Sequence, residues 1–142
     1  MADFILITGD KAMFNPTFGQ ATVTVRPGDL IGTGKHKING KLVCVDGDEK
    51  KVTVPSCPYI TSKCSIPGMG MLFIKSLASD QKAKNVKSGG KPVLLKGGEF
   101  KAKFTVLVPA QQPSAPNPIP DTTLQYSGSG TFLSTNSKVK GT

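Results

Sequence analysis

The sequence has little of what nucleic-acid recognition uses. It contains no tryptophan, and Arg26 is the one arginine among 18 basic residues. Arginine is the usual residue for bidentate contacts to phosphates and base edges, whereas lysine supplies a point charge without readout. We therefore attribute the net charge of +9 to lysines that keep a strand-rich surface soluble and discourage pairing between strand edges. Nucleic acid is not an expected partner.

Long apolar runs are also missing. No stretch approaches the roughly 18 residues that a membrane-spanning helix needs. The run "FILI", residues 4 to 7, is too short for the core of a signal peptide, and Asp3 precedes it where a basic region would be expected. The sequence thus predicts synthesis in the cytoplasm without a signal peptide. Thiols stay reduced there, so the three cysteines are expected as buried thiols or metal ligands rather than as disulfides.

Catalytic constellations are absent from the sequence. It has no G-x-S-x-G elbow, no phosphate-binding loop and no evident pair of carboxylates. A nucleophilic cysteine would depend on His36, the only histidine, as its base. We therefore expect no catalytic residues and predict that the protein is not an enzyme.

Glycine and proline are abundant, with 16 and 11 copies, and the remaining pattern is that of strands. Residues 21 to 25 alternate strictly between apolar and polar types, and residues 91–95 and 99–108 read as two further strands. Residues 68–77 form a more continuous apolar run, which predicts a strand covered on both faces. Only residues 79–86 suggest a short helix. The predicted fold is an all-β domain of mainly short antiparallel strands with at most one short helix. In the strand at 99–108, one face is predicted to be buried, namely that of Phe100, Ala102, Phe104, Val106 and Val108.

A composition shift divides the chain. Residues 109–121 contain five prolines and predict an extended, semi-rigid linker. We expect one domain at residues 1–108, this linker, and a C-terminal tail or added strand at 122–142, because the last segment is too short for a domain.

One hairpin is strongly marked. Asn39 and Gly40 separate two strand-like runs, which is typical of a two-residue turn. In that register His36 lies opposite Val43, and Cys44 points to the other face. His36, Cys44, Cys57 and Cys64 have the ligand types of a structural zinc site, but their spacings lack a C-x-x-C knuckle. Buried or unused thiols are the alternative interpretation.

The hairpin region resembles the PAAR-repeat and PAAR-like proteins that tip the spikes of contractile injection systems, including type VI secretion and phage-tail-like extracellular particles. Asn39, Gly40 and Lys41 followed by Gly47 and Asp48 fit the family's hairpin signature. Residues 26–29 are similar to an Arg-x-Gly-Asp unit, and residues 89–95 are similar to the Gly-Gly-Lys-Pro-Val-Leu-Leu variants. A C-terminal run, "SGSGTFLSTNSKVKG", is similar to a further family motif with several departures.

This resemblance implies a small cone of β-strands that caps a trimeric, VgrG-like β-helical spike, one copy per trimer. It also implies an effector cargo, transient contact with a target membrane, and assembly at the tip of a particle that releases or injects the protein on contraction. A structural Zn²⁺ near the apex would use Cys57 and Cys64 with Cys44 and His36, although the family's His-Gly-Gly run is missing here. The alternative function is a small basic β-barrel that binds single-stranded nucleic acid through residues 82–98.

Overall fold

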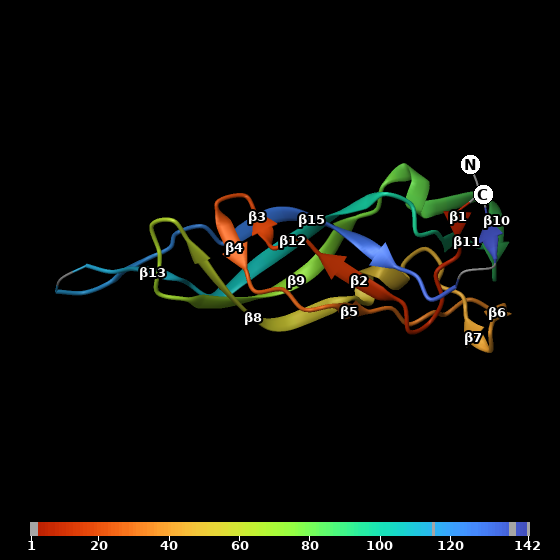
Figure 1. Cartoon of the computed structure of the whole chain (residues 1–142), viewed down its shortest axis with the longest axis horizontal. Helices are drawn as coiled ribbons and strands as arrows, with labels where there is room; N and C mark the ends of the chain where they lie inside the picture. Colours follow the sequence, from red (N-terminus) through yellow and green to blue (C-terminus); the bar gives the residue numbers. More distant parts are fainter. Residues whose placement is uncertain (1–2, 115, 137–138, 142) are drawn as a thin grey trace.

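A computed structural model describes residues 3–114, 116–136 and 139–141 of the chain. The molecule is elongated, with both chain ends at one extremity and a narrow hairpin at the other (Figure 1). No helix in the described part of the chain is long and apolar enough to cross a membrane. The all-β prediction is confirmed, because apart from two short 3₁₀ turns every regular element is a strand.

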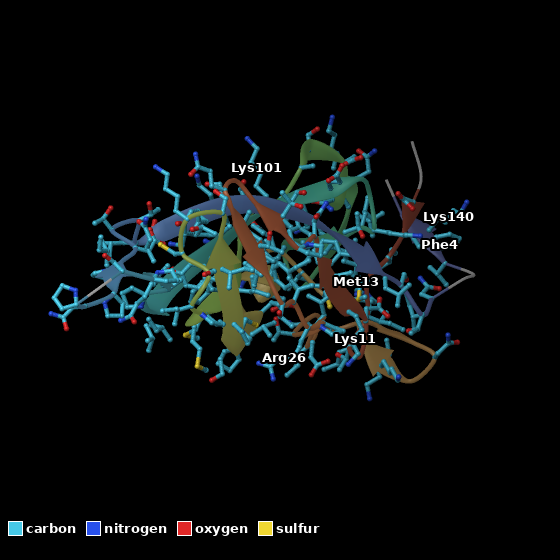
Figure 2. The ribbon with its side chains drawn as sticks, turned by 60° about the vertical axis from the view of Figure 1, so that its left-hand side comes forward. Phe4, Lys11, Met13, Arg26, Lys101 and Lys140 are labelled. Carbon is cyan, nitrogen blue, oxygen red and sulfur yellow. The ribbon has the colours of Figure 1, made fainter. Side chains whose placement is uncertain are left out.

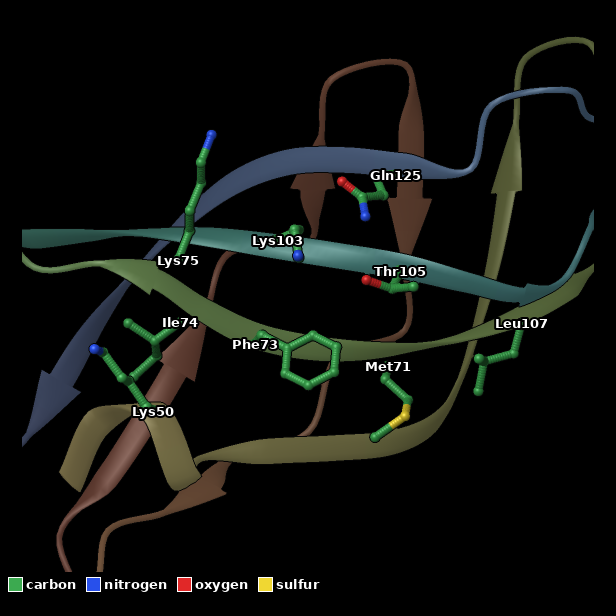
Figure 3. Close-up of a pocket in the computed structure, with 9 residues that line it drawn as sticks. All are labelled: Lys50, Met71, Phe73, Ile74, Lys75, Lys103, Thr105, Leu107 and Gln125. Carbon is green, nitrogen blue, oxygen red and sulfur yellow. The ribbon is translucent and has the colours of Figure 1, made fainter. Parts of the chain in front are cut away.

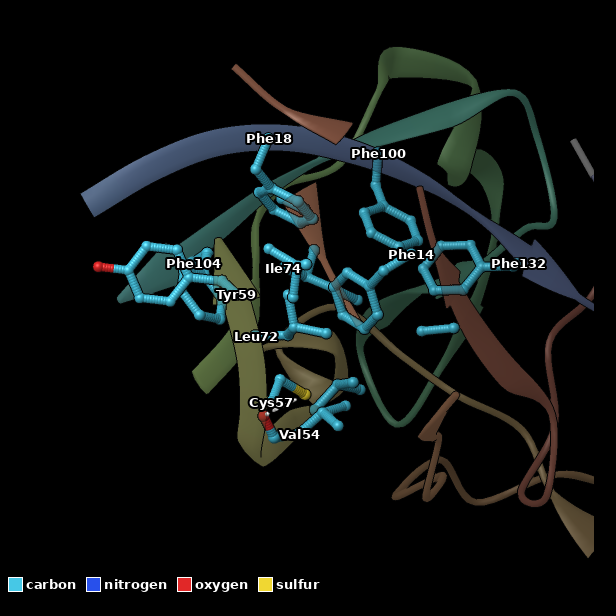
Figure 4. Packing of buried hydrophobic residues seen from close by; sticks show 14 of the residues in the cluster. Phe14, Phe18, Val54, Cys57, Tyr59, Leu72, Ile74, Phe100, Phe104 and Phe132 are labelled. Carbon is cyan, nitrogen blue, oxygen red and sulfur yellow. Dashed lines mark hydrogen bonds between the residues drawn. The ribbon is translucent and has the colours of Figure 1, made fainter. Parts of the chain in front are cut away.

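Eight strands form one curled antiparallel sheet in the order β3-β4-β8-β9-β12-β15-β2-β5. Aromatic side chains fill the inside of the curl (Figure 4). Phe104 packs edge-on against Tyr59, and Phe100 does so against Phe14. The strands of this sheet are β2 (Lys11–Phe14), β3 (Thr17–Phe18), β4 (Ala21–Val23), β5 (Gly28–Asp29), β8 (Thr53–Thr61), β9 (Gly68–Ser76), β12 (Glu99–Val108) and β15 (Gln125–Leu133).

Four two-stranded ribbons complete the fold. Three of them lie at the extremity that holds the chain ends, and the fourth forms the narrow hairpin at the other (Figure 1). The first three pair β1 (Asp3–Phe4) with β16 (Lys140–Gly141), β6 (Lys37–Ile38) with β7 (Lys41–Leu42), and β10 (Lys82–Ser88) with β11 (Lys91–Leu94); the fourth pairs β13 (Gln111–Gln112) with β14 (Ile119–Pro120). The 3₁₀ turns are η1 (Asp48–Lys51) and η2 (Ser79–Gln81).

The predicted helix at residues 79–86 is wrong beyond its first turn. After η2 the chain becomes β10, which pairs with β11 across a turn in which Gly89 and Gly90 both have positive φ. Ala83 is buried and Val86 packs against an apolar cluster, so tertiary packing on a strand overrides a weak helical pattern.

Strand β12 matches its predicted bounds, and Phe100, Ala102 and Phe104 are buried as expected. The register shifts between Val106 and Val108, and Val108 is 56% exposed.

Strand β9 is not covered on both faces: Leu72 and Ile74 are buried, whereas Met71 and Phe73 on the outer face are only half-buried. Strand β15 comes from the segment expected as a tail or added strand, and it lies inside the sheet between β12 and β2.

Glycine in β15 gives the aromatic core its space. A Cβ at Gly130 would lie 2.5 Å from both the Phe100 ring and the Met13 carbonyl oxygen. Gly130→Ala is therefore expected to destabilise the fold by about 1–3 kcal/mol through overpacking. Denaturant unfolding measures this loss. Ser129→Ala in the same strand is the control, and equal stability of the two variants would contradict this packing.

Candidate functional site

Three short chain segments meet in a triangle where the ribbons join the curled sheet. They are residues 5–7, which follow β1, residues 43–45, which follow β7, and residues 93–95, which include the end of β11. We call these segments the triangle, and the β1–β16, β6–β7 and β10–β11 ribbons the three arms.

The centre of the triangle is a closed ring of backbone hydrogen bonds. The Leu6 N–H donates to the Leu94 carbonyl oxygen, that of Leu94 to Cys44, and that of Cys44 back to Leu6, each with an N···O distance of 2.9 Å. Antiparallel bridges extend the ring at its three junctions, because the first residue of each segment pairs with the last residue of another: Ile5 with Leu95, Val43 with Ile7, and Val93 with Val45. A single chain thus has local three-fold symmetry in its hydrogen bonding.

Side chains leave the triangle in two directions, as strand alternation requires. The three central residues, Leu6, Cys44 and Leu94, are fully buried and belong to the aromatic core of the curled sheet. The flanking residues form a second buried cluster with Ala83, against which Ile38 and Val86 pack. The triangle is therefore the layer that joins the core to the arms. Its flanking residues are Ile5, Ile7, Val43, Val45, Val93 and Leu95.

Each segment of the triangle is followed by a turn or a bend, which we call a corner. At two of the three corners a carboxylate accepts hydrogen bonds in the same way. Asp10 accepts a hydrogen bond from the Ile7 N–H at 2.9 Å, and Asp48 accepts one from the Val45 N–H at 2.8 Å. Each carboxylate also accepts from the N–H and hydroxyl of one threonine, Thr135 at Asp10 and Thr33 at Asp48. The third corner has Gly98 in place of aspartate. There the Leu95 N–H donates to the Gln81 carbonyl oxygen instead.

The arms repeat one feature at equivalent positions. On the outer strand of each arm a lysine lies directly opposite an apolar residue: Lys140 opposite Phe4, Lys37 opposite Leu42, and Lys87 opposite Pro92. All three lysines are exposed. Figure 2 shows Lys140 beside Phe4, with its amino group 4.8 Å from the ring centre.

The predicted hairpin signature lies in the second arm. Asn39 and Gly40 both have positive φ, as a two-residue turn between Ile38 and Lys41 requires. Gly47, also with positive φ, and Asp48 form the corner that follows the segment 43–45. Sequence reasoning found this one unit but missed that it recurs. The signal was three apolar residues, one further residue, then Gly-Asp or Gly-Gly, as in "ILITGD", "VCVDGD" and "VLLKGG".

The four predicted metal ligands are not brought together. Cys44 and His36 point to opposite faces of their hairpin, as the register predicted, and the His36 ring nitrogen Nδ1 lies 2.7 Å from the Ser88 hydroxyl in the third arm. Cys57 is fully buried in β8, with its sulfur 3.6 Å from the Val54 carbonyl oxygen, and Cys64 is also buried. Within the described ranges, no group of three or more His, Cys, Asp or Glu side chains is placed to hold a metal ion. The geometry therefore does not fit a shared zinc site for this set.

Two further features bear on function, a groove on the sheet and the contacts of Asp121. A shallow groove of about 510 Å³ lies on the outer face of β9 and β12, where Met71, Phe73 and Leu107 meet Lys75 and Lys103 (Figure 3). No carboxylate, histidine or cysteine is among its lining residues.

At the far extremity Asp121 fastens the proline-rich segment to the sheet, because it accepts hydrogen bonds from the Tyr59 and Tyr126 hydroxyls at 2.9 and 2.6 Å.

The family model for contractile injection system spike tip proteins matches residues 1–142. Among curated proteins, none matches the chain significantly.

The two corner aspartates are expected to be essential for the triangle. Asp48→Ala leaves the Val45 N–H and the Thr33 donors without their acceptor and should cost about 2–4 kcal/mol of unfolding free energy, and Asp10→Ala should cost a similar amount. Asp46→Ala is the matched control, since Asp46 forms only a half-exposed ion pair with Lys82, worth about 0–1 kcal/mol. Denaturant midpoints that do not separate the two groups of variants would contradict this role.

Cys44 is expected to be chemically inert in the folded protein. Burial, with smaller contributions from Asp48 and Asp10, raises the pKa of its thiol from 9.0 to about 12. In a Cys57→Ala/Cys64→Ala variant, a thiol reagent at neutral pH should react only as fast as the protein unfolds. Because the folded-state pKa is the higher one, the Cys44 contribution to stability is complete below pH 9 and is lost between pH 9 and about 12. Rapid labelling of the native variant at neutral pH would show that the triangle is open.

Proposed function

Because the chain belongs to the family of contractile injection system spike tip proteins, we propose that it caps a trimeric β-helical spike through its triangle and three arms. One observation carries this proposal: a single chain closes a three-fold ring of hydrogen bonds through Leu6, Cys44 and Leu94. The triangle gives that end of the molecule the symmetry of a trimer.

Symmetry limits how one chain can bind a trimer. Three identical spike subunits present three identical surfaces, and one chain can meet them equally only if it offers three similar surfaces itself. The arms do so in backbone geometry and in the repeated pair of a lysine with an apolar residue. The end of a β-helix also leaves strand edges unpaired, and a β-rich cap removes that hazard by continuing the hydrogen-bond ladder. We therefore infer that outer arm strands pair with strands of a VgrG-like spike.

The remaining architecture suits a mechanical role. The curled sheet holds its strands around tightly packed aromatic rings, and it projects away from the arms along the molecular axis (Figures 1 and 4). In the assembled particle this part would form the leading point that meets the target envelope when the sheath contracts. On this proposal the function is structural rather than catalytic, and effector cargo remains an expectation from the resemblance alone.

Edge pairing can be tested at Lys37. Ile38 and Lys41 flank the turn, and the His36 carbonyl accepts from Val43, so the Lys37 N–H points out of the ribbon. Lys37→Pro removes this outward donor while leaving the hydrogen bonds inside the arm intact. We expect it to weaken binding to the trimeric spike about tenfold or more.

Lys37→Ala, which keeps the N–H, is the matched control. Titration calorimetry measures the affinities, and native mass spectrometry measures the stoichiometry, expected as one copy per spike trimer. Equal affinities for the proline and alanine variants would contradict edge pairing. A stoichiometry of one copy per spike subunit would contradict the cap itself.

A further inference from the structure

The extremity opposite the arms carries an unusual amount of exposed apolar surface. Met69 pairs with Val108 there, Ile66 bridges to Gln111, and Ile119 pairs with Gln112 in the narrow hairpin. The Leu124 carbonyl oxygen accepts a hydrogen bond from Val106, so Leu124 lies at the same end. Six of the eleven large apolar side chains found exposed in the described ranges gather here, and we call them the distal patch: Ile66, Met69, Leu107, Val108, Ile119 and Leu124, which are 36–70% exposed.

Charge is nearly missing from the chain that builds this end. Between Phe104 and Asn136 the sequence has one charged residue, Asp121, so the other segments hold all 18 basic and 8 of the 9 acidic residues. Asp121 is not a free surface charge, because two tyrosine hydroxyls and the Thr123 N–H donate to it. Lysines adjoin this end at two places: Lys63 lies three residues before Ile66, and Lys75 and Lys103 line the groove that Leu107 also lines. The strong positive charge of the protein is thus confined largely to the rest of the molecule.

The backbone of the same end is also poor in free donors. Residues 109–120 include five prolines, which have no N–H group. Gln111 exchanges two backbone hydrogen bonds with Ile66, at 2.9 and 3.0 Å, and the Asp121 N–H donates to the Ala110 carbonyl. An unpaired N–H costs several kcal/mol in hydrocarbon. A hairpin in which prolines and internal pairs remove such groups is therefore suited to an apolar medium as well as to water.

We propose that the distal patch binds the acyl-chain region of a lipid bilayer and that it does so without regard to lipid headgroup charge. The proposal rests on the proposed function for one point only, that the arms face the spike and leave this end leading. A lipid surface is the occupant that the chemistry favours, because the patch offers apolar side chains beside a hairpin whose prolines and internal hydrogen bonds leave few N–H groups to desolvate. The lysine-rich remainder would be drawn to anionic headgroups instead, so the two modes of binding can be separated.

The test is flotation of the full chain with vesicles of pure phosphatidylcholine, which carry no net charge, at about 1 M salt, where the Debye length is about 3 Å. We expect the wild-type protein to float with the vesicles. Leu107→Ser/Leu124→Ser should lower the bound fraction at least tenfold. Ile31→Ser/Leu133→Ser is the matched control, since it removes two side chains of similar exposure, 63% and 52% against 58% and 70%, outside the patch.

Three results would overturn the proposal. The first is failure of the wild type to float with neutral vesicles, and the second is an equal loss in both double variants. The third is sedimentation as a dimer that Leu107→Ser/Leu124→Ser dissociates, which would make the patch a contact between copies. Spike binding by the same variants keeps the two claims apart: flotation without a one-per-trimer complex overturns the proposed function, and the complex without flotation overturns only the lipid inference.

Discussion

The ring of three hydrogen bonds among Leu6, Cys44 and Leu94 joins the aromatic core to the three arms. It brings together residues that are far apart in the sequence. It also positions the aromatic core on one side and the three arms on the other. Beneath it, the same three residues close the aromatic core. Around it, the strands continue into three arms of similar geometry. The ring consists of main-chain groups. Its three-fold symmetry therefore does not depend on the side chains, which are leucine at two positions and cysteine at the third.

The two extremities are chemically opposite, and this polarity agrees with the proposed function, in which one end meets the spike and the other leads. One end has local three-fold symmetry and repeated lysines, whereas the other is narrow, proline-rich and almost uncharged. In the curled sheet between them, glycines such as Gly130 allow aromatic rings to pack directly against the backbone. On the proposed function, a force applied at the arms would reach the far end through this closely packed sheet.

The sequence allowed much of the fold to be predicted, but little of the site. Alternation and turn chemistry indicated strands such as β12 and the two-residue turn at Asn39 and Gly40, because both signals are local. The triangle depends on pairing among segments that start at Ile5, Val43 and Val93, and a single sequence shows such pairing only as a faint repeat. Residues 82–86 form a strand rather than the predicted helix, because the packing of Ala83 and Val86 against the second apolar cluster decides their conformation.

On the proposed function, all three arms meet the spike together. Hydrogen–deuterium exchange of the protein, alone and bound to the trimeric spike, can detect this contact arm by arm. We expect slower exchange on binding in all three arms, around Lys37, Lys87 and Lys140, with the distal hairpin of β13 and β14 unchanged. Protection confined to one arm, or protection at the distal hairpin in place of the arms, would contradict it.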